Sequence, residues 1–143
     1  MLVAATLSGC APVPDAAGIS QPDLVDQVWT LRTLQGETLS GERIATLRLG
    51  SDGAVTGTLA CNTVGPSKLR WTRLPRGSGG TIDADGTGAG IVTTLGCGNT
   101  SAVRLAGRFW QLMDTAESWS LQRGGLRVTF ADATDAYLVP IKP

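Results

Sequence analysis

Alternation of apolar and polar residues predicts that most of this chain forms short β-strands. The pattern is clearest near the start, where Trp29 and Leu31 share one face of a strand and Val28 and Thr30 the other. Turn residues such as Gly53 separate successive strands, and the final strand is expected at an edge of the sheet because it ends in proline. The predicted strands cover residues 28–34, 44–49, 54–60, 68–74, 118–122, 126–130 and 136–140.

Two glycine-containing stretches interrupt this pattern. Gly57 lies inside the third predicted strand, where it indicates a bulge or a close approach of two backbone segments. Residues 76–90 carry so many glycines that we expect mostly loop there, with one short strand over 81–83.

The period changes after Ser101. Apolar residues then recur at three- and four-residue steps, which predicts one amphipathic helix with arginines on its opposite face. Asn99, Thr100 and Ser101 are expected to cap its first turn. The apolar positions are Ala102, Leu105, Ala106, Phe109, Leu112 and Met113. The chain is therefore expected to combine antiparallel strands with a single helix.

An apolar run at the start of the chain ends in Leu-Ser-Gly-Cys and resembles the lipobox of bacterial lipoproteins, in which the cysteine is acylated before cleavage. We interpret residues 1–9 as a signal peptide that lacks its positively charged beginning, and Cys10 as the acylated residue, with palmitate among its chains. Residues 10–25 are rich in Pro, Ala and Gly and form a flexible tether to a folded domain over 26–143. The alternative is a buried N-terminal strand with a chance cysteine.

The chain of 143 residues has three cysteines and no histidine. If Cys10 is acylated, Cys61 and Cys97 remain as a pair in an oxidising compartment, where a disulfide persists. Two thiolates without histidine make a poor zinc site, and neither thiol has a partner for catalysis. A disulfide between Cys61 and Cys97 is the preferred interpretation, and Asn62 is expected to bond the backbone of its own turn.

Composition excludes several classes of function. Twelve basic and twelve acidic residues cancel, so no net field attracts phosphate backbones and no nucleic-acid partner is expected. Without histidine or a Gly-x-Ser-x-Gly motif we expect no enzyme, although a hydrolase that uses only carboxylates is an alternative. Residues 83–86 lack the further acidic ligands of a calcium loop, so no metal or other cofactor is expected.

Basic residues in the strand over 68–74 alternate with Leu69 and Trp71, and Leu74 is a candidate for the same inner face. Their outer face fits an exposed strand or a contact with anionic lipid headgroups. The simplest expectation for all the tryptophans is packing in the core or at its rim. These are Trp29, Trp71, Trp110 and Trp119.

Several short motifs, taken in order, resemble the META domain family over about residues 26–139. The motifs are Trp29–Leu31, Gly57–Asn62, Thr94–Cys97, the helix with Phe109 and Leu112, and the hairpin with Trp119, Leu126 and Phe130. The family includes HslJ-like bacterial lipoproteins. The resemblance implies an α+β fold in which a strongly bent antiparallel sheet, or partial β-barrel, is closed by one helix. It also implies an envelope or secreted protein without known catalytic activity, associated with heat stress and novobiocin tolerance.

Two hypotheses of function follow. The first is a non-catalytic, monomeric, lipid-anchored domain on the extracytoplasmic side of the cell envelope. It would serve stress tolerance or envelope integrity by binding an envelope protein at a sheet edge or at the loop over 76–90. The second is a carrier or sensor that holds an apolar small molecule or lipid inside the barrel; an inhibitor role is a third. Trp71, Trp119, Leu121 and Asn62 are candidate pocket or docking residues. A cavity lined by the first three favours the carrier, and a filled interior favours docking.

Overall fold

The computed structural model describes residues 24–39, 44–65, 68–74, 78–84, 96–98 and 100–141. The strands are β1 (Val28–Leu34), β2 (Glu37–Thr38), β3 (Ala45–Leu49), β4 (Val55–Leu59), β5 (Asn62–Val64), β6 (Leu69–Arg73), β7 (Gly79–Ala84), β8 (Ala116–Gln122), β9 (Gly125–Phe130) and β10 (Asp135–Pro140), and the helix is α1 (Ser101–Met113). All strand pairs are antiparallel, in the order β5-β4-β3-β1-β10-β9-β8-β7-β6, with β2 beside β1.

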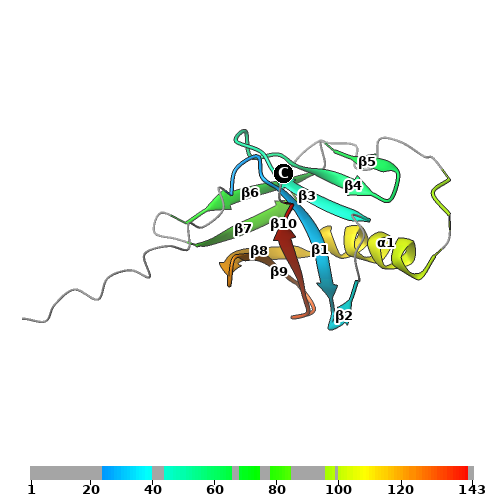
Figure 1. Ribbon diagram of the computed structural model, residues 1–143. Coiled ribbons are helices and arrows are strands. Elements are labelled where there is room, and N and C mark those ends of the chain that lie inside the picture. The colour runs from blue at the N-terminus through cyan, green and yellow to red at the C-terminus, as the bar shows by residue number, and fades with distance from the viewer. Residues whose placement is uncertain are drawn as a thin grey trace, which may run out of the picture.

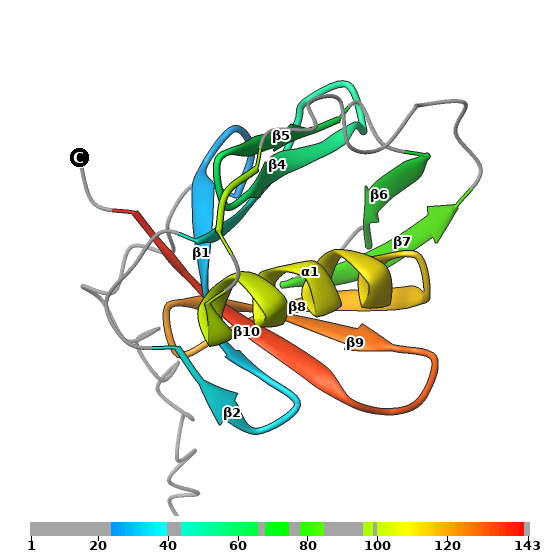
Figure 2. The ribbon, with the colours of Figure 1, turned by 90° about the vertical axis from the view of Figure 1, so that its right-hand side faces the viewer.

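The sheet curls into a half-barrel, and α1 lies across its open side (Figures 1 and 2). The segment before β4 and the strand β6 come together across the opening of the sheet, because Ala54 bridges to Arg70 and the backbone N–H of Trp71 donates to the Gly53 carbonyl at 3.1 Å. The predicted α+β class, a strongly bent antiparallel sheet closed by one helix, is confirmed.

The inner face of the sheet is apolar because the strand residues alternate as predicted. Trp29, Leu31 and Leu34 of β1 are all buried. The slip in the pattern before Leu34 is a β-bulge between Leu31 and Thr33 in the pairing with β10, which returns Leu34 to the core. The turn before β4 also forms as predicted, with Gly53 at φ 84°.

Helix α1 begins at the predicted cap. The Val103 N–H donates to Thr100 Oγ1 at 3.2 Å, so one of the amides without an intrahelical partner is satisfied. The residues buried against the sheet are Leu105, Ala106, Phe109, Trp110 and Met113. Trp110 widens the predicted apolar stripe, and its indole N–H donates to the Thr58 carbonyl of β4 at 2.9 Å. The helix is thereby fixed to the sheet by a hydrogen bond as well as by apolar contact.

The prediction that the last strand lies at an edge is wrong. β10 pairs with β1 on one side and with β9 on the other, so it lies in the middle of the sheet. Its proline is tolerated because Pro140 is the last residue of the strand, opposite Trp29, where a missing amide donor removes no interior ladder bond.

Two further predictions for the middle of the chain are corrected. The glycine-rich stretch contains a six-residue strand, β7, rather than the short strand over 81–83. Its glycines are accommodated because Gly80 packs directly against Trp119 of β8, where an added Cβ would lie 2.6 Å from Nε1. Leu74 is not on the inner face: it follows the end of β6 and is 57% exposed.

The described part of the chain begins with residues that pack on the fold. Leu24 is buried, and Val25 forms a parallel bridge with Leu49 of β3. The last two residues of the segment assigned to the tether therefore contact the domain. In the described ranges, the helix α1 is too short to cross a membrane, and no other helix there could do so.

Candidate functional site

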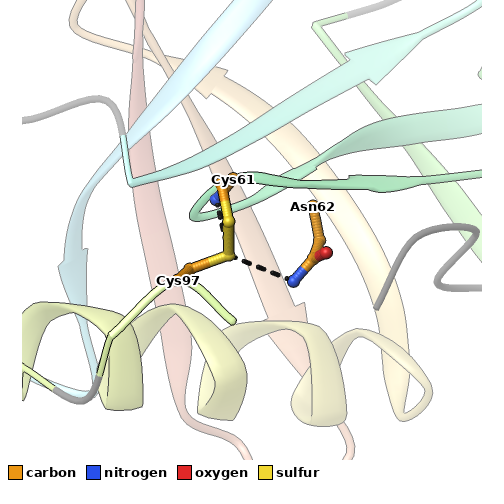
Figure 3. Close-up of a disulfide and its surroundings, with 3 residues drawn as sticks. All are labelled: Cys61, Asn62 and Cys97. Atoms are coloured by element: carbon orange, nitrogen blue, oxygen red, sulfur yellow. Dashed lines mark hydrogen bonds between the residues drawn. A yellow bond between two sulfur atoms is a disulfide. The ribbon is translucent and has the colours of Figure 1, made fainter. Parts of the chain in front are cut away.

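The predicted cysteine pair forms a disulfide. Cys61 lies in the turn between β4 and β5, Cys97 lies three residues before the helix cap Thr100, and their Cα atoms are 5.5 Å apart. Cys97 Sγ accepts hydrogen bonds from the Cys61 N–H at 3.1 Å and from Asn62 Nδ2 at 3.2 Å (Figure 3). The side-chain amide of Asn62 reaches the sulfur of the other segment, a contact that the sequence did not predict. The junction thus ties the β4–β5 turn to the start of α1.

The predicted pocket residues pack against one another. The rings of Trp71 and Trp119 meet edge to face with centroids 5.9 Å apart, and both side chains are buried. Each indole N–H already donates to a backbone carbonyl at 2.8 Å, Trp71 to Gly50 and Trp119 to Thr72. Leu121 is half-buried against the same core. These side chains therefore occupy the position where a pocket was expected, and neither indole has a donor left for a carried molecule.

Replacing Trp119 with phenylalanine is expected to destabilise the domain more than the same change at Trp29. Both side chains are fully buried, but the Trp29 indole N–H has no hydrogen-bond partner. Trp119→Phe would leave the Thr72 carbonyl without its donor, whereas Trp29→Phe would remove a buried unsatisfied group; each effect is worth about 1–3 kcal/mol. Urea unfolding of the two variants checks the order. A loss at Trp29 equal to or larger than that at Trp119 would contradict this account.

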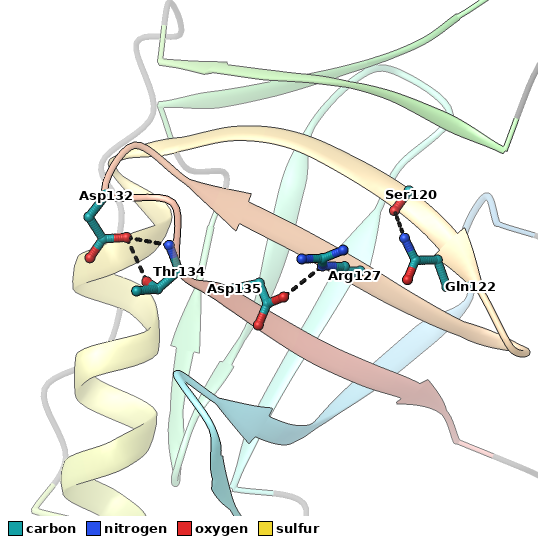
Figure 4. Close-up of polar contacts among 6 residues, drawn as sticks. All are labelled: Ser120, Gln122, Arg127, Asp132, Thr134 and Asp135. Carbon is teal, nitrogen blue, oxygen red and sulfur yellow. Dashed lines mark hydrogen bonds and ion pairs between the residues drawn. The ribbon is translucent and has the colours of Figure 1, made fainter.

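The outer face of β8, β9 and β10 carries polar side chains that are paired among themselves (Figure 4). Arg127 Nε donates to Asp135 Oδ2 at 2.6 Å. Asp132 Oδ1 accepts from the Thr134 hydroxyl at 2.6 Å and from its N–H at 2.9 Å, and these bonds lower the pKa of the Asp132 carboxyl. The two bonds to Asp132 close the turn between β9 and β10. The polar side chains of this face therefore have a structural role.

A groove of about 440 Å³ lies between α1 and β2. Its lining residues are Glu37, Ser101, Arg104, Leu105 and Arg108. Arg108 Nη2 is 3.0 Å from Glu37 Oε1, and Arg108 Nε is buried without a hydrogen-bond partner. From the sequence we placed the two arginines on the polar side of the helix, but β2 was not predicted, so Glu37 was missed. The available signal was a pair of arginines four residues apart on the helix.

Other candidate chemistry is limited. Cys10 lies outside the described residues, as does the loop over 85–90. No group of three or more His, Cys, Asp or Glu side chains that could hold a metal occurs in the described part of the chain. The strongest candidates that remain are the groove beside α1 and the exposed end of β6.

Comparison with known proteins identifies the family. No curated protein matches the chain. A solved structure, the NMR structure of a protein from Burkholderia xenovorans, is similar to it with 17% sequence identity and a TM-score of 0.52, over 99% of this chain and 100% of the other. At that identity the likeness shows the fold alone. The profile of the META domain matches residues 22–140. That match spans most of the chain, which therefore belongs to the META domain family.

Proposed function

We propose that this protein is a non-catalytic, HslJ-like binding protein of the cell envelope, held on the extracytoplasmic side of the membrane by acyl chains on Cys10. It serves stress tolerance or envelope integrity by contacting another envelope protein. The family match supports the domain type. The anchor rests on the Leu-Ser-Gly-Cys motif, and the lack of histidine in the chain supports a role without acid–base catalysis.

The packing of the predicted pocket residues on one another is the observation that carries this choice. A carrier needs an apolar space into which its ligand can fit. At the position where we expected such a space, the Trp71 and Trp119 rings contact each other, and their indole groups are bonded to backbone. A binding surface on the outside of the domain is therefore favoured over a ligand inside it.

The outer edge of β6 is the surface that suits a protein partner. β6 pairs with β7 on one side. On the other side, the residues just before β4 contact it through the bridge between Ala54 and Arg70 and the hydrogen bond from the Trp71 N–H to the Gly53 carbonyl. Arg73 is exposed beyond that bridge, and Leu74 after it is 57% exposed. An extended segment of a partner can add to such an edge through main-chain hydrogen bonds, with an apolar contact at Leu74.

Native mass spectrometry of the protein purified from its own envelope tests the anchor and the absence of a carried molecule. We expect a mass gain at Cys10 that survives denaturation, and no further adduct that denaturation releases. An unmodified Cys10 would contradict the lipid anchor. A releasable apolar adduct would contradict docking and favour the carrier.

Site-specific photo-crosslinking in intact cells tests the contact surface. A photoreactive residue at Leu74 is expected to give one crosslinked species of defined mass. Val28 is the matched control, because it is also an exposed apolar side chain, at 37%, but lies on β1, which pairs with β3 and β10 on its two edges. Equal yields at the two positions, or none at Leu74, would overturn the assignment of the β6 edge.

A further inference from the structure

We propose that the disulfide between Cys61 and Cys97 is a thiol–disulfide exchange site, at which an external dithiol attacks Cys61 and Cys97 leaves as a thiolate. The bond joins the β4–β5 turn to the segment before α1 (Figure 3). Such a reaction adds a redox-dependent state to the stabilising role that a disulfide has in any fold. The inference does not depend on the proposed protein contact at β6, which lies on a different element.

The first argument is access to the two sulfur atoms. Cys61 is exposed, whereas Cys97 is half-buried. Exchange requires an incoming thiolate to reach one sulfur of the disulfide, and access decides which sulfur it attacks. A disulfide between two buried residues is closed to an external thiol until the domain opens. The exposed turn therefore directs the attack to Cys61.

The second argument is the set of donors around the other sulfur. Cys97 Sγ accepts hydrogen bonds from the Cys61 N–H at 3.1 Å and from Asn62 Nδ2 at 3.2 Å. When the S–S bond breaks after attack on Cys61, the electron pair stays on Cys97 Sγ. Hydrogen bonds to a developing negative charge are stronger than those to a neutral acceptor, and a better stabilised thiolate leaves faster. Both donors therefore favour Cys97 as the leaving group.

The third argument is that the surrounding structure is held by contacts other than the disulfide. Asn62 is the first residue of β5, which pairs with β4, and the Ala60 N–H of the same turn donates to the Ile44 carbonyl at 2.6 Å. On the other side, α1 is attached to β4 by the hydrogen bond from the Trp110 indole to the Thr58 carbonyl at 2.9 Å. Reduction should therefore separate the two segments locally, without unfolding the domain, and the bond can form again.

The exchange has two steps. One thiolate of the dithiol attacks Cys61 Sγ and forms a mixed disulfide with it, while the Cys61–Cys97 bond breaks and Cys97 takes the electron pair. The second thiolate of the dithiol then attacks the dithiol's own sulfur in the mixed disulfide and releases Cys61. The protein gains two electrons and the two protons of the dithiol, which is itself oxidised to a disulfide.

Reaction of the oxidised full chain carrying Cys10→Ala with glutathione, under native conditions, tests which sulfur is attacked. The reaction is quenched with N-ethylmaleimide, and mass spectrometry of the peptides locates each added group. We expect glutathione on Cys61 and maleimide on Cys97. Glutathione mainly on Cys97, or evenly on both cysteines, would overturn the inference.

The rate of reduction by dithiothreitol tests the role of Asn62 in the same protein. We expect Asn62→Ala to slow the reduction about fivefold, because the developing charge on Cys97 loses one donor. A merely structural role predicts the opposite, since a looser junction would expose the disulfide and speed up the reaction. Gln122→Ala is the matched control, because the Gln122 amide also bonds a side chain, Ser120 Oγ at 3.1 Å, but lies on β8. Its loss should leave the rate unchanged.

The dependence of the rate on dithiothreitol and urea separates exchange in the folded state from exchange after unfolding. We expect a rate that is proportional to the dithiothreitol concentration and that does not rise with urea below the unfolding transition. A rate that instead follows the unfolded fraction would overturn the inference. So would an Asn62→Ala variant that is reduced as fast as the unsubstituted protein or faster, or a Gln122→Ala variant that is slowed as much as Asn62→Ala.

Discussion

Replacing Gly57 with valine is expected to prevent the domain from folding, or to remove most of its stability. A Cβ at this position would lie 1.9 Å from the Thr46 carbonyl oxygen and 2.7 Å from Trp110 Cζ2. Neither neighbour can move freely. Thr46 belongs to β3, which is paired along β4, and the Trp110 indole is bonded to the Thr58 carbonyl. A side chain at Gly57 must therefore separate α1 from the sheet or break the β3–β4 ladder, at an expected cost of about 4 kcal/mol or more.

Urea unfolding followed by circular dichroism measures this effect, and Gly107→Ala is the control. Gly107 lies inside α1 with no atom within 4 Å of an added Cβ. Alanine there removes backbone freedom from the unfolded chain without a clash, so we expect it to stabilise the domain by about 0.5–1 kcal/mol. A Gly57→Val protein with the wild-type urea midpoint would show that the approach of α1 to β4 is looser than the structure indicates.

The sequence predicted the elements of this fold whose signals are local. The alternation around Trp29 and Leu31, the turn at Gly53 and the cap at Thr100 depend on residues close together in the chain, and all three form as predicted. Gly57 was also informative, because a glycine inside a strand usually marks a β-bulge or a close approach of two segments.

Features set by long-range pairing could not be predicted in this way. The central position of β10 depends on β1, which lies about a hundred residues earlier in the chain, and nothing in its own residues distinguishes a central strand from an edge strand. β7 is a strand because β6 and β8 pair with it on both sides and Trp119 covers Gly80, although glycine itself disfavours strands.

The groove was missed for the same reason as the strand pairing. Arg104 and Arg108 were visible as the polar side of a helix, but a groove requires a second wall. That wall is Glu37 on a two-residue strand, which is too short for any periodic signal. The disulfide partners could be paired from the sequence only because the other cysteine belongs to a lipobox-like motif.

Loss of the disulfide is the second change for which we expect a large effect. The bond joins residues 36 positions apart, and it lies where the β4–β5 turn meets the segment before α1. In the chain-entropy model, closing a loop of this length stabilises the folded state by about 4 kcal/mol, against a total of about 5–15 kcal/mol for a typical domain. The double variant Cys61→Ala/Cys97→Ala avoids free thiols and should lose most of this amount in urea unfolding.

Asn62→Ala separates the covalent link from the hydrogen bonds around it. This variant keeps the disulfide and removes the bond from Asn62 Nδ2 to Cys97 Sγ, so the expected loss for that bond is about 1 kcal/mol. If the disulfide acts mainly through the unfolded chain, the double alanine variant should unfold at much lower urea concentration yet keep the wild-type spectrum when folded. If the double variant were no less stable than Asn62→Ala, the loop-closure argument would fail. In that case the junction would contribute to stability through its local hydrogen bonds alone.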